Sequence, residues 1–294
     1  MNEFLKRIKS LPPEKQAELL AKLTKSKNKT AKSGVDFSKN FEYTFKSDMP
    51  FDFNLRQTEI SEPGSDYIQI RAKASSLNFR DVMIASKQYP SSPGVPTNMG
   101  SDYAGIIEKV GDNVKKFKPG DEVISIHIGH TENDEILRDN CHFIKTFNVH
   151  KFCVCLKPKN LSFEEACCIP TVFLTSYIGL IKLGRLRKSE NLLIHTASGG
   201  VGLSALQIAQ WKQATIFTTA GTKEKREHLR SNGIKNVYDS RSLDFATVLK
   251  SKKTELDIVL NTLSGELMFE SIKLLKPFGK FIHIDKKDIA KDTH

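Results

Sequence analysis

The chain has 294 residues, and 45 Lys and Arg against 34 Asp and Glu give it a net charge of +11 at neutral pH. At this length two domains can each bury a core of their own. No apolar run approaches the length of a membrane span, and an odd cysteine count without a signal peptide favours a reducing cytoplasm, so membrane and secreted classes are not expected.

The first segment, residues 1–36, is strongly basic. Residues 1–34 hold nine Lys or Arg and three Glu, so they supply +6 of the net charge. Residues 12–23 have prolines at the start of an amphipathic pattern, which predicts a helix, and residues 25–32 are polar and predicted to be flexible. We interpret the segment as a basic helical linker. Nucleic-acid binding is the alternative, but the rest of the chain has no reader motif, so no nucleic-acid partner is expected.

Residues 37–160 predict a compact, mainly β domain. Short β-rich runs at 67–72, 104–110 and 122–126 are separated by turn signals such as Glu-Pro-Gly and Lys-Pro-Gly-Asp. A catalytic cleft is expected between this domain and the one that follows it.

Residues 161–294 predict a nucleotide-binding domain. An apolar strand at 191–195 runs into a turn of small residues, and a helix with an apolar face follows at 201–211. The turn reads A-x-G-x-x-G, the dinucleotide fingerprint with alanine in the first glycine position. It consists of Ala197, Ser198, Gly199, Gly200, Val201 and Gly202.

The pattern predicts a structural role for each glycine of this turn. Gly199 and Gly200 let the backbone approach a pyrophosphate, and Gly202 lets the helix pack close to the strand. The helix N-terminus offers free N–H groups and a partial positive charge to the phosphates. The alternative is a tight strand-to-helix turn that binds nothing.

Further strands are predicted at 215–219, 236–238, 257–260 and 280–284, with a helix at about 266–276 that Pro277 ends. Strands that alternate with helices indicate βαβ units and a mostly parallel sheet, so the chain is predicted to be an α/β protein. Ligands bind such sheets at the carboxyl ends of the strands.

The residues after the 215–219 strand predict which dinucleotide binds. An NAD site places an acidic residue at this tip, whereas here the tip has none and offers Thr222, Lys225 and Arg226. A 2′-phosphate needs hydrogen-bond donors and positive charge, so NADPH is favoured over NADH. For one of the three cations Lys223, Lys225 and Arg226, a solvated position on a helix is the alternative.

Several segments, taken together and in order, resemble the enoyl reductase domain of polyketide and fatty acid synthases, a zinc-independent branch of the medium-chain dehydrogenase/reductases that also contains quinone oxidoreductases. The resemblance covers about residues 38–290. It implies a β-rich GroES-like substrate domain followed by a Rossmann-type nucleotide-binding domain. The segments are 77–83 (LNFRDVM), 100–105 (GSDYAG), 117–123 (FKPGDEV), 169–177 (IPTVFLTSY), 194–202, 224–226 (EKR), 240–241 (SR), 259–266 (VLNTLSGE) and 277–281 (PFGKF).

Two absences point to the zinc-independent branch. Zinc members carry a Gly-His-Glu histidine where this chain reads Gly100-Ser101-Asp102, and they carry a structural four-cysteine loop. None of the five cysteines here has C-x-x-C spacing, so no metal is expected.

The resemblance implies the reaction. NADPH reduces the α,β-double bond of an enoyl thioester bound to an acyl carrier protein, beside neighbouring synthase domains and in a protein that can oligomerise. Tyr89, in a Gln-Tyr-Pro context, matches a proposed proton donor, although packing at the domain edge is the alternative for this residue. Asp288 matches an aspartate of the family. A family Lys or Arg before the 256–261 run is here Thr254, so Lys253 or its neighbour Lys252 is the candidate replacement.

The resemblance also implies cofactor contacts outside the glycine turn. Thr175, at the start of a helix on the cofactor side, and Asn261, at a strand end, match positions that touch the nicotinamide ribose. Asn78 lies in a motif near the floor of the site, and Arg241 in the Ser-Arg segment is assigned to the cofactor. His195 is expected to be a packed core histidine, and Arg80 is expected to pair with Asp81. 

Two other functions stay open at this point. One is a free-standing quinone or enone reductase, against which the N-terminal linker argues. The other is a non-catalytic scaffold domain, because Thr254 and Asp285 depart from the family pattern and the nucleotide domain is expected to be truncated at its C-terminus.

Overall fold

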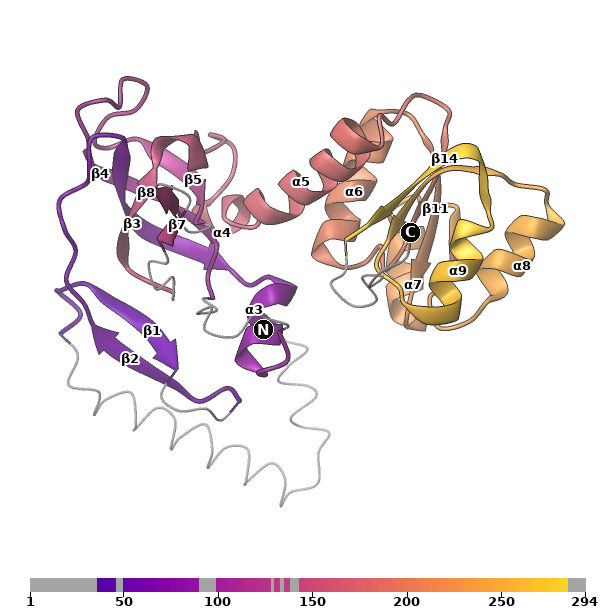
Figure 1. The fold of residues 1–294 in the computed structure, drawn as a ribbon, viewed down its shortest axis with the longest axis horizontal. Helices are drawn as coiled ribbons and strands as arrows, with labels where there is room; N and C mark the ends of the chain where they lie inside the picture. Colours follow the sequence, from indigo (N-terminus) through magenta and orange to yellow (C-terminus); the bar gives the residue numbers. More distant parts are fainter. Residues whose placement is uncertain are drawn as a thin grey trace, which may run out of the picture.

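The computed structural model describes two lobes joined by a helical connection (Figure 1). Asp285 and Asp288 lie outside the described residues, as does the predicted linker up to residue 35. The described residues are 36–45, 50–89, 99–127, 130–132, 135–137 and 143–284.

The first lobe is built on a five-stranded antiparallel sheet in the order β8-β3-β4-β5-β9. Apolar residues of alternating strand positions, among them Ile68, Ile70 and Tyr103, form its core, as the predicted β domain requires. The elements are β1 (Phe41–Phe45), β2 (Phe53–Gln57), β3 (Tyr67–Ser76), α3 (Phe79–Ala85), β4 (Asp102–Val110), β5 (Glu122–Ile126), β6 (His130–Glu132), β7 (Glu135–Leu137), β8 (Thr146–His150), η1 (Lys151–Cys153) and β9 (Val154–Leu156).

The second lobe is a parallel sheet in the order β12-β11-β10-β13-β14 with helices on its faces. The order reverses between β10 and β13, the point at which doubly wound sheets bind ligands. The predicted Rossmann-type fold is therefore confirmed. The elements are β10 (Asn191–Ile194), α6 (Gly200–Trp211), β11 (Thr215–Ala220), α7 (Lys223–Ser231), β12 (Asn236–Asp239), α8 (Asp244–Ser251), β13 (Leu256–Asn261), α9 (Gly265–Ile272) and β14 (Leu275–His283).

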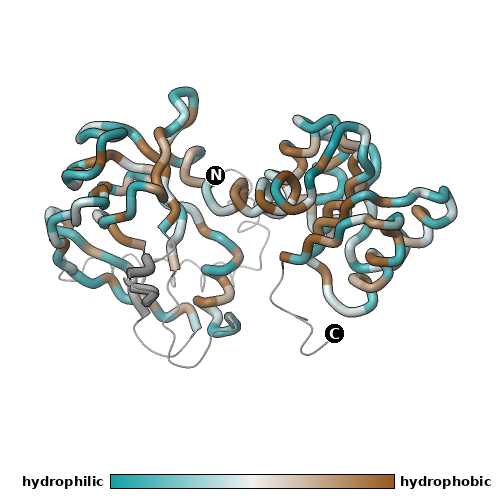
Figure 2. The backbone as a smooth tube through the Cα atoms, turned by 45° about the horizontal axis from the view of Figure 1, so that its top comes forward, coloured by the Kyte–Doolittle hydropathy of each residue, from teal (hydrophilic) through white to brown (hydrophobic). Residues whose placement is uncertain are grey.

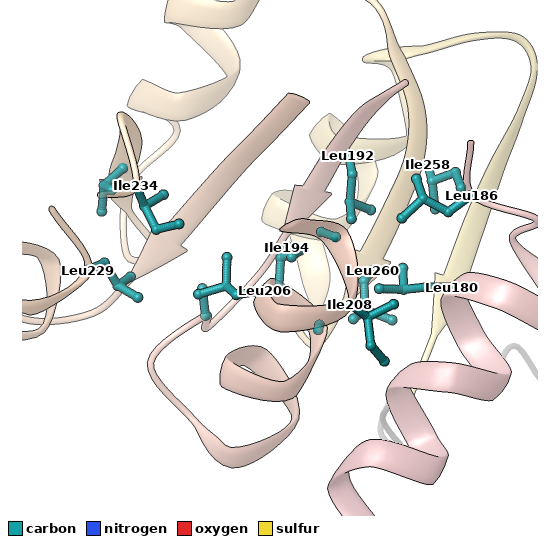
Figure 3. Close-up of a cluster of buried hydrophobic side chains, with 14 of the residues drawn as sticks. Leu180, Leu186, Leu192, Ile194, Leu206, Ile208, Leu229, Ile234, Ile258 and Leu260 are labelled. Carbon is teal, nitrogen blue, oxygen red and sulfur yellow. The ribbon is translucent and has the colours of Figure 1, made fainter. Parts of the chain in front are cut away.

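Both faces of this parallel sheet are buried. Leu192 and Ile194 point to one face, where they pack with Leu206 and Ile208 of α6 (Figure 3). Leu193, between them, points to the other face and joins a cluster under α8 and α9. Burial on both faces explains why the strands read as continuous apolar runs, visible as the hydrophobic centre of this lobe in Figure 2.

The connection between the lobes is a helical stretch made of α4 (Phe163–Ala166), α5 (Pro170–Tyr177) and η2 (Ile178–Leu183). Contrary to the sequence expectation, the span Phe163–Leu183 is long and apolar enough to cross a membrane by length and composition alone. One such helix is weak evidence for a membrane span. This helix contacts the nucleotide lobe, because Ser176 Oγ donates to Val201 O at 3.0 Å and Leu180 is fully buried.

One predicted helix boundary is wrong. The helix expected to run to Pro277 ends at Ile272, and Pro277 lies inside β14. Leu256 pairs with Leu275 and Ile258 pairs with Lys280, so residues 276–279 bulge out of the ladder. Proline is tolerated there because no partner strand requires its missing N–H group.

Candidate functional site

The glycine turn lies between β10 and α6, as predicted. A Cβ atom on Gly202 would come within 2.5 Å of the Ala197 Cα, so only glycine lets α6 approach the turn this closely. On Gly199 a Cβ would meet only Thr196 O, at an ordinary 3.4 Å, and the backbone there is extended with φ −85°. Neither packing nor conformation requires glycine at 199, so the approach of a ligand to the backbone accounts for it, beside the modest preference for glycine at a helix N-cap.

The start of the turn is held by burial and by a hydrogen bond to the neighbouring strand. Ala197 is fully buried, and its N–H donates to Thr219 O of the neighbouring strand at 2.9 Å. No side chain caps the N-terminus of the twelve-residue helix α6, so N–H groups of its first turn stay available to an anion. Ser198 and Val201 complete the stretch that the sequence assigned to the pyrophosphate.

His195, two residues before Ala197, has a structural role. It is 1% exposed, and its ring nitrogens lie 3.0 Å from Thr219 Oγ1 and 2.9 Å from Ser271 Oγ. Burial lowers the pKa of His195 to about 3, so the ring is neutral near neutral pH. The expectation of a packed core histidine is confirmed.

Asn261 lies at the carboxyl end of β13, on the same edge of the sheet as the glycine turn. Its side chain is fully buried, donates to Leu263 O at 2.7 Å and lies 2.9 Å from His283 Nδ1. The adjacent Thr262 hydroxyl lies 2.7 Å from that of Thr196, next to the turn. The structure therefore brings Asn261 to the predicted site, where its amide also shapes the turn after β13.

The tip of β11 gathers the predicted cations. Thr222 caps α7 by accepting from Lys225 N at 3.3 Å, and the Arg241 guanidinium covers Gly221. The sequence places no acid at the end of this strand, but the structure brings one there from outside the segment, because Asp239, at the end of the next strand, pairs with Arg226 at 2.8 Å. Local sequence could not reveal it, since parallel strands pair across long chain separations.

A buried carboxylate links the first lobe to the helix that connects the two lobes. Asp102, at the start of β4, is fully buried and accepts from Thr171 N at 3.1 Å and Thr171 Oγ1 at 2.6 Å. It also accepts from Asn78 Nδ2 at 3.1 Å. Burial raises the pKa of Asp102, while the hydrogen bonds from Thr171 and Asn78 act against that rise. Asn78 is thus held against α5, the helix that leads into the nucleotide lobe.

Thr175 lies on that helix. It is the sixth residue of α5, which begins at Pro170, and not at the helix start as expected. Its neighbour Ser176 is hydrogen-bonded to Val201 O in the first turn of α6, so Thr175 belongs to the part of α5 that adjoins the glycine turn.

The expected pairing of Arg80 with Asp81 is wrong. Asp81 occupies the third position of α3, where its carboxylate accepts from Asn78 N at 2.7 Å and from Gly100 N at 2.9 Å. Arg80 is exposed, and its guanidinium lies 5.5 Å from the centre of the Tyr89 ring. Adjacent helix residues point about 100° apart, which separates the two side chains.

Tyr89 is partly buried. Its ring packs against a small cluster of Ile84, Ala85 and Met99, and Arg80 lies beside it. Both predicted roles, a packed aromatic residue and a proton donor, are compatible with this position.

Lys253 is not brought to the site. It lies in the loop between α8 and β13, before that strand begins, whereas the glycine turn follows β10. Because β10 and β13 are parallel, with Leu192 paired to Ile258, Lys253 lies at the opposite edge of the sheet. The prediction took Lys253 from the resemblance, as a substitute for the family's Lys or Arg before the strand, and did not consider the direction of that strand.

The described residues hold no group of three His, Cys, Asp or Glu side chains that could bind a metal ion. Asp102, next to Ser101, is committed to hydrogen bonds with Asn78 and Thr171.

The comparisons agree with a dehydrogenase/reductase built from a GroES-like and a nucleotide-binding domain. Residues 64–175 match the family "Alcohol dehydrogenase GroES-like domain", and residues 200–285 match "Zinc-binding dehydrogenase". The crystal structure of CurK enoyl reductase superposes with a TM-score of 0.75 at 33% identity, covering 86% of this chain and 76% of that one. The chain belongs to the medium-chain dehydrogenase/reductases, in the family of polyketide synthase enoyl reductase domains.

Two further relatives extend the comparison. The chain is 37% identical over 233 residues to phthioceranic/hydroxyphthioceranic acid synthase of Mycobacterium tuberculosis, which covers 79% of this chain and 10% of that synthase. The chain thus spans about a tenth of the length of the curated relatives it matches. Escherichia coli quinone oxidoreductase, solved in complex with NADPH, is 27% identical with a TM-score of 0.68, covering 82% of this chain and 72% of that one.

Proposed function

We propose that this chain is the enoyl reductase domain of a larger synthase and reduces the α,β-double bond of enoyl thioesters carried by an acyl carrier protein. The observation that carries the proposal is the glycine turn. Gly199 has no packing or conformational need to be glycine and lies at the uncapped N-terminus of α6. This geometry fits a dinucleotide pyrophosphate.

The residues around the turn fit NADPH. The pyrophosphate would bind along Ala197, Ser198, Gly199, Gly200, Val201 and Gly202. Asn261, Thr175 and Asn78 would surround the nicotinamide end. Thr222, Lys225 and Arg241 would meet the 2′-phosphate, with Arg226 close by. The charge at this tip favours a phosphorylated ribose, because charge-assisted hydrogen bonds to phosphate are strong.

When bound, NADPH supplies a hydride to the β-carbon of the enoyl group. The residues of the chain then have two tasks, to donate hydrogen bonds to the thioester oxygen as it gains charge and to protonate the α-carbon. We assign the proton to the Tyr89 hydroxyl, because the Arg80 cation 5.5 Å from its ring would stabilise the phenolate left behind. Asp288 is a further candidate for this chemistry.

The proposed reaction uses no zinc. Ser101 stands where zinc members have histidine, and the Asp102 carboxylate is enclosed by hydrogen bonds to Asn78 and Thr171. This donor set does not fit a catalytic zinc site.

The proposal includes a domain plan: a linker at 1–36, a substrate domain at 37–160 and a nucleotide domain at 161–294. The partners would be an acyl carrier protein and neighbouring synthase domains, in a cytoplasmic assembly that can oligomerise.

The test compares substrates with the purified chain. We expect NADPH to bind with a fluorescence change and a crotonyl thioester of pantetheine to be reduced faster than a simple quinone. Faster quinone reduction would favour the free-standing reductase. The similarity to quinone oxidoreductase is the observation that supports this second candidate. Absence of both NADPH binding and enone reduction would favour a scaffold domain.

A further inference from the structure

Asp239 is the acidic residue that the sequence did not place at the nucleotide site. It ends β12, and the strand register sets it beside Ala220 at the tip of β11. Each carboxylate oxygen has a different partner. Oδ2 lies 2.8 Å from the Arg226 guanidinium, and Oδ1 accepts from the backbone N–H of Arg241 at 2.9 Å.

The guanidinium of Arg226 already has two partners within the protein. Its side chain is 19% exposed, and Nη1 donates to Ala220 O at 3.1 Å as well as pairing with Asp239. Ser240 N also donates to Ala220 O, at 3.2 Å. Arg226 therefore holds the ends of β11 and β12 together.

The guanidinium of Arg241 takes no part in the pairing between Arg226 and Asp239. The residue is exposed, and its guanidinium lies directly over Gly221, 3.2 Å (Nε) and 3.5 Å (Cζ) from where a Cβ of that glycine would be. A planar guanidinium on the tip of the second strand lies where the cofactor ribose binds in this fold class. Among the described residues, no acidic side chain forms an ion pair with Arg241 or with Lys225 within 4 Å.

We propose that Asp239 is a positioning residue for recognition of the 2′-phosphate. Through Oδ1 it fixes the backbone that carries Arg241 over Gly221, and through Oδ2 it keeps Arg226 in the strand-end tether. Selectivity for the phosphorylated ribose then resides in Arg241, assisted by Lys225, and not in Arg226. This inference rests on the proposed function. Its rival is that Asp239 accepts a hydrogen bond from an unphosphorylated ribose, as acidic residues do in NAD sites.

The experiment measures binding of adenosine 2′,5′-bisphosphate and adenosine 5′-monophosphate by calorimetry, without any turnover. The readout is the ratio of the two affinities, the phosphate preference. We expect Arg241→Gln to lower this preference about tenfold or more, the size of one charge-assisted hydrogen bond. Its affinity for the monophosphate should stay near that of the unmodified chain.

The matched pair is Asp239→Asn and Asp239→Ala, which remove the same charge. The asparagine keeps an oxygen that can accept from Arg241 N–H, whereas the alanine does not. We expect the preference of Asp239→Ala to be about fivefold or more below that of Asp239→Asn, an effect of lost positioning at constant charge. Equal preferences in the two variants would overturn the positioning role.

The controls separate this inference from the proposed function. If the unmodified chain binds neither adenosine nucleotide, the nucleotide site itself fails, and the inference fails with it. If it binds both and prefers the bisphosphate, but Arg241→Gln keeps that preference, only the inference fails. The rival would be established if the unmodified chain binds the monophosphate more tightly than Asp239→Ala does and shows no preference for the bisphosphate.

Discussion

Two glycines of one turn provide a matched test of what the turn is for. Gly202→Ala places a Cβ 2.5 Å from the Ala197 Cα, where ordinary contacts begin near 3.4 Å, so α6 or the turn must move by about 1 Å. Gly199→Ala places a Cβ in contact only with Thr196 O at 3.4 Å, on an extended backbone that alanine adopts freely. The first change perturbs the fold, and the second perturbs only the space a ligand would use.

The expected energies follow from these contacts. The Cβ on Gly202 meets three backbone atoms of Ala197, so overpacking costs about 2–3 kcal/mol, of which the better helix propensity of alanine returns about 1 kcal/mol, leaving a net loss of about 1–2 kcal/mol. At Gly199 a small loss of helix capping and a small gain from a less flexible unfolded chain, each under about 1 kcal/mol, nearly cancel. We expect Gly202→Ala to lower the Tm by about 2–8 °C and Gly199→Ala to leave it within about 2 °C.

The assay combines thermal unfolding with NADPH binding by fluorescence. Gly199→Ala should lose at least about tenfold in NADPH affinity at unchanged Tm, because its Cβ occupies the approach of the pyrophosphate. Undiminished NADPH affinity in Gly199→Ala would refute the assignment of the turn to a ligand. An unchanged Tm in Gly202→Ala would refute the packing argument.

Three further predictions follow from buried and half-buried groups. His195 is neutral in the folded chain, where burial lowers its pKa to about 3, but in the unfolded chain it protonates near the ordinary histidine pKa of about 6.5. The free energy of unfolding should therefore fall by about 1.4 kcal/mol for each pH unit as the pH drops between these two values. Chemical denaturation at several pH values should show this dependence weakened in His195→Gln, and the same slope in that variant and the unmodified chain would contradict the argument. Asp102→Ala leaves the Thr171 and Asn78 donors unmatched and should lower the free energy of unfolding by about 3 kcal/mol, and a loss below about 1 kcal/mol would count against its linking role. Tyr89→Phe should slow thioester reduction about a hundredfold at unchanged NADPH affinity, because it removes the proton donor. Lys253→Ala should leave the rate unchanged, because Lys253 lies at the opposite edge of the sheet. In steady-state kinetics, a slow Lys253→Ala and a normal Tyr89→Phe would exchange the roles of the two residues.

The second lobe could be predicted from the sequence to within a few residues. Its strands are short apolar runs bounded by turn residues, and the chain alternates regularly between strand and helix. Pro277 misled the prediction because a proline usually ends a helix, whereas here it lies in a bulge of β14. That bulge depends on the pairing of β14 with β13, which no local pattern reports.

The site was predicted where one segment supplies the residues, and missed where several segments meet. The glycine turn is continuous in the chain, so its geometry followed from the pattern. Asp239 reaches the tip of β11 only through the pairing of β11 with β12, and Asp102 meets Thr171 across 69 residues. Lys253 shows the same limit, because strand direction decides which edge of the sheet a neighbouring residue occupies.

The central claim is that this chain reduces carrier-bound enoyl thioesters with NADPH. The most direct measurement is mass spectrometry of a crotonyl group on an acyl carrier protein, before and after incubation with the chain and NADPH. The account predicts that the acyl group gains two hydrogen atoms, that the Gly199→Ala variant gains them far more slowly, and that a sample without NADPH gains none. An acyl mass that stays unchanged while NADPH is bound would contradict it.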